Sequence, residues 1–380
     1  MRINWGLIGG GEGSQIGGAH RIAAGLDGAF QFAAGALDID SKRGREYAIR
    51  LGVAPDRAYG DWREMLASEK ARSDRIELVT VATPNNTHFE ISKAFLEAGF
   101  DVLCEKPLTT NVQDALDLVR IARERGRICA VNYGYSGYPL IRHARAMVAR
   151  GDLGKIRVVM AEFAHGHHAD AADADNPRIR WRYDPKQAGI SSITADCGIH
   201  ALHLVTFVTG QHMTSLSADF VSAVPGRELE DDALIAFRLT GGTAGRLWTS
   251  AVAAGRVHGL TLQVFGEKGG LRWQQELPNQ LYWSPVGRET VTIERGAAGL
   301  SPEADCASRL TIGHAEGLFG AFANIYADLA EVLRAKKENR APNPLALSYP
   351  TAGDGLEGVA AVHAAAMSAK QRGAWTDVEV

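Results

Sequence analysis

The first third of the chain alternates between short apolar runs and segments whose apolar residues recur at helical spacing. The apolar runs lie at residues 3–8, 32–37, 76–83, 102–104 and 127–134, and the helical segments lie at about 18–26, from 41 onward, at 87–99 and at 111–126. The run at 76–83 is continuous and rich in β-branched residues, which is typical of a strand buried on both faces. This alternation predicts a parallel sheet with helices on both faces.

The pattern changes after about residue 150. Strands separated by glycine turns are expected at 155–166, 215–224, 233–242, 244–255, 259–270 and 271–275, and helices are expected at about 197–208, 314–337 and 355–371. Consecutive strands without helices between them favour a mostly antiparallel sheet. The sequence therefore predicts two domains of an α/β protein, a parallel-sheet domain at residues 1–134 and an α+β domain at residues 135–380.

The composition supports two packed cores and argues against charged polymers as partners. The 380 residues are 46% hydrophobic and carry a formal net charge of −3 at pH 7. This balance gives no electrostatic footprint for nucleic acid or an anionic membrane. No apolar run is long enough to span a bilayer, and the N-terminus lacks the apolar stretch of a signal peptide. The four cysteines are scattered, so reduced thiols in a cytoplasmic protein are expected.

The glycine-rich segment 6–20, GLIGGGEGSQIGGAH, follows the first apolar run and is the first candidate site. Glycines allow a tight turn after a strand and the close approach of a pyrophosphate, whose charge is favoured at a helix N-terminus. Gly9 and Gly11 open the dinucleotide fingerprint, but the third glycine is displaced because Ser14 occupies its position. Gly17 or Gly18 would take that role. The position of this loop in an alternating domain favours a dinucleotide site over an ordinary turn.

Asp38 ends the second apolar run and is the candidate for selecting the cofactor. A carboxylate at this point hydrogen-bonds the adenosine ribose hydroxyls and repels a 2′-phosphate, which favours NAD over NADP. Asp40 is an alternative candidate, and a solvated turn aspartate is the structural alternative. Lys42 and Arg43 follow closely, so NADP is the less favoured cofactor rather than an excluded one.

Two further segments end strands of the same parallel sheet. ATPNNTH (82–88) closes the third buried strand, and CEKP (104–107) closes the next. Turn formation explains the proline and asparagines of the first segment. Ligands of such sheets bind beyond the carboxyl ends of the strands, however, so Lys106 is expected where the nicotinamide end of a dinucleotide lies. Lysine near a core needs a partner or a chemical task.

Asp196 and His200 form the fourth candidate, within ITADCGIHALHL (193–204). If Asp196 opens a helix, His200 lies one turn further on the same face. A carboxylate and an imidazole near a lysine suit proton transfer from an alcohol. Such a pair is, taken alone, more often a helix cap and a packed histidine, and His203 lies on the same side.

Two histidine segments are candidates for a metal or substrate site. The run AHGHHADAADAD (164–175) is rich in histidine and aspartate but lacks the spacing of a metal motif, so a polar loop at the mouth of the site is expected and no metal. IGHAEG (312–317) places His314 at an expected helix start, where it caps the helix or contacts substrate.

Together these segments resemble the Gfo/Idh/MocA oxidoreductase family, in its inositol dehydrogenase-like branch. The resemblance covers most of the chain and rests on the glycine loop with His20 behind it, on ATPNNTH, CEKP and DCGIH, and on GHAEGLF (313–319). It implies an N-terminal Rossmann domain, a C-terminal domain with a large, mostly antiparallel open sheet, and a homotetramer assembled through that sheet. It also implies a catalytic group of Lys106, Asp196 and His200.

The resemblance further implies the ligand contacts and the reaction. Cofactor contacts are expected from Gly9, Gly11, Ser14, Gln15, Ile16, Asp38, Thr83, Pro84, Asn85, His88, Glu105 and Lys106. Substrate contacts are expected from Lys106, Tyr135, His167, Arg178, Trp181, Asp196, His200 and His314. For Arg178 and Arg182 the alternative is surface pairing with Asp173, Asp175 or Asp184.

The expected reaction is the NAD-dependent oxidation of a secondary hydroxyl of a cyclic polyol, scyllo-inositol first and a pyranose sugar second. An aldose or glycoside dehydrogenase with the same machinery is the alternative enzyme. A non-catalytic dinucleotide-binding sensor is the alternative of another class. The joint presence of Lys106, Asp196 and His200 argues against the sensor, which needs none of them.

Overall fold

The computed structural model describes residues 2–170 and 176–380, and the chain divides into two compact units. Unit 1 comprises residues 1–109, 113–137 and 318–355, and unit 2 comprises residues 110–112, 138–317 and 356–380. The predicted division into 1–134 and 135–380 stays a prediction. That prediction did not include residues 318–355 in the first domain, whereas the structure places them in unit 1.

Unit 1 is built on a five-stranded parallel sheet with the strand order β2-β1-β3-β4-β5. The strands are β1 (Ile3–Gly9), β2 (Phe30–Ala36), β3 (Leu78–Ala82), β4 (Asp101–Cys104) and β5 (Cys129–Val131). The helices are α1 (Gln15–Leu26), α2 (Ser41–Arg50), α3 (Trp62–Ala71), α4 (His88–Glu97), α5 (Val112–Arg125) and α11 (Leu318–Lys337). The predicted Rossmann-type sheet is confirmed.

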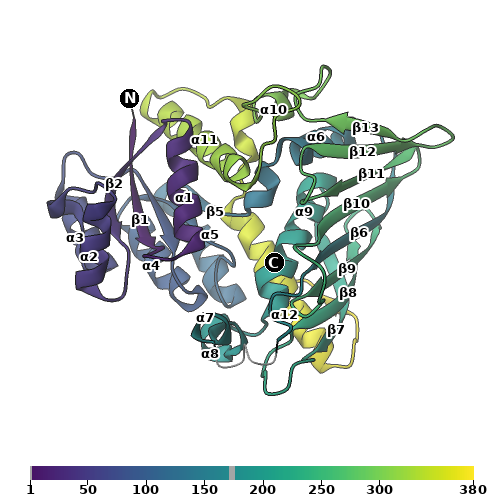
Figure 1. Cartoon of the computed structure of the whole chain (residues 1–380), viewed down its shortest axis with the longest axis horizontal. Helices are drawn as coiled ribbons and strands as arrows, with labels where there is room; N and C mark the ends of the chain where they lie inside the picture. The colour runs from purple at the N-terminus through teal and green to yellow at the C-terminus, as the bar shows by residue number, and fades with distance from the viewer. Residues whose placement is uncertain (1, 171–175) are drawn as a thin grey trace. The chain divides into compact units, whose positions relative to one another are not determined.

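The core of unit 1 follows from the two-residue period of β1. Ile3, Trp5 and Leu7 point to one face, where α1 and α11 pack side by side (Figure 1). Gly6 points to the other face, where a Cβ atom would lie 2.4 Å from the side chain of Met65 in α3. Burial of apolar side chains on both faces explains why these strands read as continuous apolar runs.

Unit 2 is built on a nine-stranded sheet within the described residues, with the order β13-β12-β11-β10-β6-β9-β8-β7-β14. The strands are β6 (Ile156–Ala164), β7 (Met213–Val221), β8 (Asp232–Leu239), β9 (Ala244–Ser250), β10 (Leu260–Gly266), β11 (Gly269–Gln274), β12 (Gln280–Pro285), β13 (Val291–Glu294) and β14 (Thr376–Asp377). Only the β6–β9 pair is parallel in this part of the structure. The predicted large, mostly antiparallel sheet is therefore confirmed.

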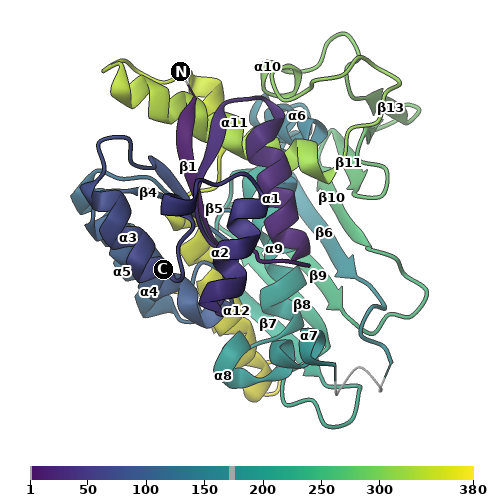
Figure 2. The ribbon, with the colours of Figure 1, turned by 60° about the vertical axis from the view of Figure 1, so that its left-hand side comes forward.

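The helices of unit 2 are α6 (Pro139–Ala149), α7 (Pro177–Arg180), α8 (Pro185–Ala188), α9 (Ile199–Thr209), α10 (Pro302–Asp305) and most of α12 (Ala352–Lys370). Helices α6 and α9 pack against each other, and α9 lies against β6 and β10 (Figure 2). Strands such as β8 and β9 accordingly alternate between buried and more exposed residues. The four cysteines are free thiols, and no described helix is both long and apolar enough to cross a membrane.

Several elements were not predicted from the sequence, although their end signals are present. Helix α3 begins after Asp61, whose carboxylate accepts hydrogen bonds from two backbone N–H groups of the first turn. Helix α6 has Pro139 at its first position, where proline is favoured. The expected helix start at His314 is wrong, because this residue lies in a turn and α11 begins only at Leu318.

Candidate functional site

The glycine loop of unit 1 has the backbone geometry of a nucleotide cradle. Gly9 and Gly10 have φ values of 77° and 64°, which favour glycine, and α1 begins shortly afterwards. A Cβ atom on Gly17 would lie 2.2 Å from the carbonyl oxygen of Gly10, so Gly17, not Gly18, provides the close approach. Ser14 caps α1 by accepting a hydrogen bond from the Gly17 N–H group at 3.1 Å. The helix N-terminus therefore meets the loop, where a pyrophosphate is favoured.

Asp38 lies beside this loop, just beyond the end of β2. A Cβ atom on Gly11 would be only 3.2 Å from the Asp38 Oδ2 atom. The guanidinium of Arg43 donates to both carboxylate oxygens, at 2.7 and 2.6 Å, and lowers the pKa of Asp38. Asp40 instead caps α2 by accepting a hydrogen bond from the Arg43 N–H group. The loop geometry therefore favours Asp38 over Asp40 as the carboxylate that meets a ribose.

The segments that follow β3 and β4 are tied together by His88. Its Nδ1 atom lies 2.8 Å from the Pro107 carbonyl oxygen, and its Nε2 atom lies 2.9 Å from the Thr83 carbonyl oxygen. The ring is fully buried, and this burial lowers the pKa of His88. Both loops thus lie at one edge of the sheet, as predicted. The predicted contact of His88 with the cofactor stays a prediction.

Lys106 is half-buried, follows the buried residue Glu105, and has a cis peptide bond to Pro107. Glu105 Oε1 accepts hydrogen bonds from His20 Nε2 at 2.9 Å and Asn132 Nδ2 at 2.5 Å, while Oε2 accepts one from the Lys106 N–H group at 3.1 Å. Burial alone raises the pKa of Glu105, but these donors and the nearby positive charge hold it below its usual range. Lys106 is therefore preceded in the chain by an ionised carboxylate, which accepts its backbone N–H group.

In unit 2, Asp196 lies inside a π-helical turn, Thr194–Gly198, that runs into α9. The expectation that Asp196 opens the helix is therefore wrong, because its N–H group already donates to Ser192. Its carboxylate accepts a hydrogen bond from Arg182 Nε at 3.1 Å. Surface pairs with Asp173, Asp175 or Asp184 were the predicted alternative for Arg182, whereas its guanidinium here contacts Asp196, the carboxylate of the predicted catalytic group.

A buried glutamate holds this turn in place. Glu230 accepts hydrogen bonds from the Ser191 hydroxyl at 2.6 Å and from the backbone N–H groups of Ser192 and Thr194 at 3.1 Å. Its burial raises the pKa of the carboxyl group. The sequence showed no signal for this contact, because Glu230 is separated from the turn by more than thirty residues. Glu230 fixes the segment from which Asp196 projects.

His200 and His203 are both buried on α9 but have different neighbours. The His200 ring lies 6.2 Å from the ring of Phe163 in β6, whereas the His203 ring lies 5.7 Å from Phe207. The guanidinium of Arg145 lies over the Phe207 ring, 4.4 Å from its centroid. Of the two histidines, His200 is thus the one seen to contact Phe163 near the end of β6, which His165 also contacts.

His165 lies among several polar side chains near the end of β6. Its Nδ1 atom accepts a hydrogen bond from the His167 N–H group at 3.2 Å, so the neutral ring carries its proton on Nε2, 3.5 Å from Cys197 Sγ. Burial and the neighbouring histidines lower the pKa of His165 to about 4. His168 Nδ1 lies 2.9 Å from the Tyr183 hydroxyl. Residues of the histidine run thus approach the Asp196 turn.

The other predicted substrate residues are spread over both units. Trp181 stacks with Arg182 at 4.6 Å, and His167 is exposed with its ring 4.7 Å from His165. His314 is exposed and lies 3.2 Å from Thr311 Oγ1. Tyr135 belongs to a buried turn of unit 1, Gly134–Gly137, and the side chain of Arg178 lies outside the described part of the chain.

Asp173 and Asp175, the alternative partners of Arg178, lie outside the described residues. Across residues 2–170 and 176–380, no three histidine, cysteine, aspartate or glutamate side chains gather in a way that could hold a metal ion.

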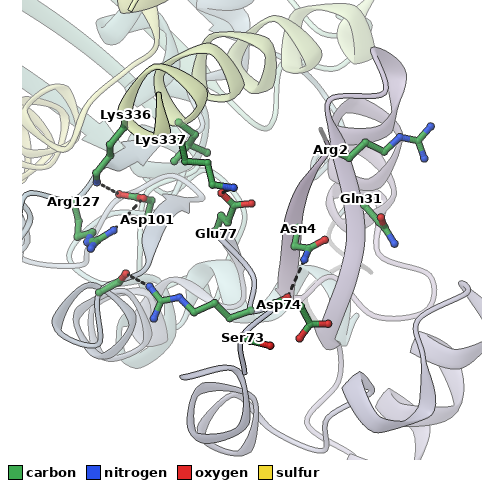
Figure 3. A pocket seen from close by; sticks show the side chains of 13 residues that line it. Arg2, Asn4, Gln31, Ser73, Asp74, Glu77, Asp101, Arg127, Lys336 and Lys337 are labelled. Atoms are coloured by element: carbon green, nitrogen blue, oxygen red, sulfur yellow. Dashed lines mark hydrogen bonds and ion pairs between the residues drawn. The ribbon is translucent and has the colours of Figure 1, made fainter. Parts of the chain in front are cut away.

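A hollow of about 790 Å³ in unit 1 lies at the opposite edge of the parallel sheet from the glycine loop (Figure 3). Its lining includes residues at the starts of β1 and β4. Lys337 pairs with Glu77 at 2.6 Å, while Lys336 and Arg127 lie 3.5 and 3.7 Å from Asp101. Because these basic groups already have carboxylate partners and the N-terminus of α1 is at the other edge, the loop of Gly9–Ser14 remains the nucleotide candidate.

Comparisons with known proteins agree with the division into a Rossmann-type part and a C-terminal part. Residues 3–133 match the GFO/IDH/MocA oxidoreductase family described as having an NAD-binding Rossmann fold, and residues 141–272 match the GFO/IDH/MocA C-terminal domain. An uncharacterized oxidoreductase of Bacillus subtilis, YfiI, is 36% identical over 379 residues, which cover 99% of this chain and 96% of that protein. The similarity thus extends over nearly the whole chain.

Two solved structures of an inositol dehydrogenase homolog from Azotobacter vinelandii are also similar. The complex with NAD⁺ has a TM-score of 0.95 and 42% identity, covering 99% of this chain and 97% of that one. The complex with NADH and myo-inositol has a TM-score of 0.92 and 41% identity, covering 99% and 98%. A levoglucosan dehydrogenase from Pseudarthrobacter phenanthrenivorans is 25% identical over 74% of this chain and 76% of its own length.

Proposed function

Because this chain belongs to the GFO/IDH/MocA family of oxidoreductases and has its NAD-binding Rossmann domain, we propose that it oxidises a secondary hydroxyl of a cyclic polyol with NAD, and that scyllo-inositol is the preferred substrate. The observation that carries this proposal is the likeness to an inositol dehydrogenase homolog complexed with NADH and myo-inositol. Scyllo-inositol and myo-inositol differ in the orientation of one hydroxyl group, so most polar contacts with one ring are available to the other, and the remaining contact would decide between the isomers. A related anhydrosugar or pyranose is the second candidate, favoured by the similarity to levoglucosan dehydrogenase.

The residues of this chain divide the chemistry between them in the proposed reaction. His200 accepts the proton of the alcohol as general base. The Lys106 ammonium stabilises the developing negative charge on the alcohol oxygen. Asp196, held by Arg182, orients the group and balances its charge. Bound NAD supplies the hydride acceptor.

Specificity for a polyhydroxylated ring requires several polar groups that the wrong isomer would leave unpaired. We assign this role to Tyr135, His167, Arg178, Trp181 and His314. Trp181 offers a flat apolar surface for the C–H face of a ring, and the imidazoles and guanidinium offer hydrogen bonds to hydroxyls. The exposure of His167 leaves its imidazole available to a ligand.

A substrate panel tests the proposed function. The purified enzyme is mixed with NAD or NADP and with scyllo-inositol, myo-inositol, glucose or levoglucosan, and the formation of reduced cofactor is followed by absorbance. We expect the highest kcat/KM with scyllo-inositol and NAD, and a higher value with myo-inositol would change the preferred isomer. A higher value with levoglucosan or glucose would replace the inositol assignment with a sugar dehydrogenase. NADH binding without turnover of any polyol or sugar would support the sensor instead.

The carboxylate of Asp38 gives a separate prediction about the cofactor. Replacing Asp38 with alanine removes the acceptor for the ribose hydroxyls and frees Arg43 to meet a 2′-phosphate. We expect the ratio of kcat/KM for NAD over NADP to fall at least about 10-fold, which corresponds to about 1.4 kcal/mol.

Asp40→Ala is the matched control for this prediction. It removes a carboxylate that caps α2, so it should lower stability and leave the cofactor ratio unchanged. A wild-type enzyme that prefers NADP would refute the role of Asp38 and direct attention to Lys42 and Arg43.

We also propose that the chain assembles as a homotetramer through the sheet of unit 2. Apolar side chains remain exposed on its strands, including Val158, Leu234 and Phe265. Such apolar exposure on a sheet face marks an interaction surface. Light scattering should give a mass four times that of the 40.8 kDa chain, and a monomeric mass would reject the assembly.

A further inference from the structure

A chain of hydrogen bonds runs through the core of unit 1 and ends on the carboxylate behind Lys106. Trp5 Nε1 lies 2.9 Å from Thr80 Oγ1, and this hydroxyl lies 2.9 Å from the Tyr326 hydroxyl. The Tyr326 oxygen lies 2.8 Å from His20 Nδ1, and His20 Nε2 lies 2.9 Å from Glu105 Oε1. All five side chains are buried. They come from β1, β3, α11, α1 and the end of β4, so no sequence pattern links them.

The donor and the acceptor of each of these hydrogen bonds follow from what each side chain can donate or accept. The Trp5 indole can only donate, and the ionised Glu105 carboxylate can only accept. Between them, Thr80 donates to the Tyr326 oxygen, Tyr326 donates to His20 Nδ1, and His20 donates from Nε2 to Glu105. With the His20 proton on Nε2, this orientation gives every proton of the four hydrogen bonds an acceptor.

These hydrogen bonds fix the orientation of the Glu105 carboxylate. His20 and Asn132 both donate to Oε1, which leaves Oε2 to accept the Lys106 N–H group. A carboxylate held from both sides fixes the backbone of the residue that follows it. Rotation of its plane would break the contact with Lys106.

We propose that His20 and Tyr326 are positioning residues for Lys106: through Glu105 they hold the lysine in the place from which it acts on the alcohol. This inference rests on the proposed function, in which Lys106 contacts the reacting hydroxyl. Neither residue reaches the substrate in this proposal. Their effect is on the alignment of Lys106, which changes the rate of the chemical step more than the affinity for either ligand.

The variant Tyr326→Phe tests the proposal, because it removes one hydroxyl and leaves the ring that packs against Trp5 and Phe30. His20 then loses the donor to Nδ1 and can turn or change tautomer. We expect kcat to fall about 10-fold, less than the roughly 100-fold cost of a displacement of about 1 Å at the reacting groups. The KM for the polyol and the Kd for NADH should stay within about twofold of the wild-type values.

Tyr59→Phe is the matched control within the same unit. Tyr59 is also buried and donates to the buried carboxylate of Glu69 at 2.9 Å, in a network with Arg57. Its loss should lower the urea midpoint as Tyr326→Phe does, without a change in kcat. Thr80→Val removes a hydroxyl one link further from Glu105, so kcat should fall less than in Tyr326→Phe.

Two results would overturn the proposal. The first is a Tyr326→Phe enzyme that loses stability like Tyr59→Phe but keeps the wild-type kcat, because the hydrogen bonds would then serve stability alone. The second is an equal fall of kcat in Tyr326→Phe and Tyr59→Phe, because the effect would then be a general loosening of the unit.

A wild-type protein that turns over no polyol or sugar would reject the proposed function, and amide hydrogen exchange then decides the positioning role by itself. Exchange is measured by mass spectrometry in the peptide that contains Glu105 and Lys106, with NADH bound. Faster exchange in Tyr326→Phe than in Tyr59→Phe supports the inferred link to Lys106. Equal exchange in the two variants rejects it.

Discussion

Replacing Lys106 with alanine is expected to lower turnover at least about 100-fold while the Kd for NADH stays close to the wild-type value. The loss follows from removing a cation that stabilises negative charge as the alcohol proton leaves, on the scale typical of electrostatic and proton-transfer groups. We expect binding to persist because the proposed cofactor contacts of the glycine loop and Asp38 lie at the other end of the dinucleotide. The measurements are steady-state kinetics with the best polyol and fluorescence titration with NADH.

Lys70→Ala is the control for this experiment, since Lys70 is an exposed lysine in the last turn of α3. It should change neither quantity. Turnover of Lys106→Ala at the wild-type rate would dismiss the chemical role of this lysine. The charge of Lys106 would then serve only to offset the buried carboxylate of Glu105.

Replacing His200 with alanine is expected to have an effect of similar size and to flatten the rise of kcat/KM with pH. The reason is the loss of the general base, which must be deprotonated before it can accept the alcohol proton. The measurement is kcat/KM across a pH series, compared between the wild type and the variant.

His203→Ala is the matched control, because both histidines are buried on α9 and their loss leaves a cavity of the same kind. His203 packs against Phe207, away from the polar groups around His165, so its loss should affect stability and leave the pH profile intact. If His203→Ala flattened the profile and His200→Ala did not, the choice of base would be wrong.

The parallel sheet could be predicted because its signals are local. Each strand of unit 1 is an apolar run, and each following helix is marked by its spacing or by a terminal glycine such as Gly99 or Gly126, both of which have positive φ values. The insertion in the glycine loop left Gly17 and Gly18 as alternatives. Only the approach of Gly17 to the backbone of Gly10 decides between them, and a contact between two chain segments is invisible in a single sequence.

The supports of the candidate site could not be predicted for the same reason. Three supporting contacts join residues that are distant in sequence. Arg182 contacts Asp196 across 14 residues, Glu230 contacts Thr194 across 36, and Tyr326 contacts His20 across 306. A charged or aromatic side chain looks alike in a sequence whether it is solvated or buried against a partner. The chemistry of Asp196 and His200 could be proposed from their spacing, but the π-helical turn that carries Asp196 depends on Glu230.

The edge strands of unit 2 were missed because their patterns are weak. Strand β13 has only four residues, all partly or fully exposed, and β14 has two. Short, exposed strands lack the alternation that a buried face imposes. Their place in the sheet is set by pairing with β12 and β7, which the neighbouring sequence does not reveal.

Helix α11 has a consequence for how the protein is made. Phe322, Tyr326, Leu329 and Leu333 of this helix belong to the core that also contains Trp5 of β1. A ribosome that has released residues 1–137 must still synthesise the strands of unit 2 before α11 emerges, which takes roughly ten to forty seconds at about 5–20 residues per second. During that time the apolar face of the parallel sheet that α1 and α11 share is covered by α1 alone. The nascent chain therefore carries an exposed hydrophobic surface of the kind that chaperones recognise, until α11 is translated.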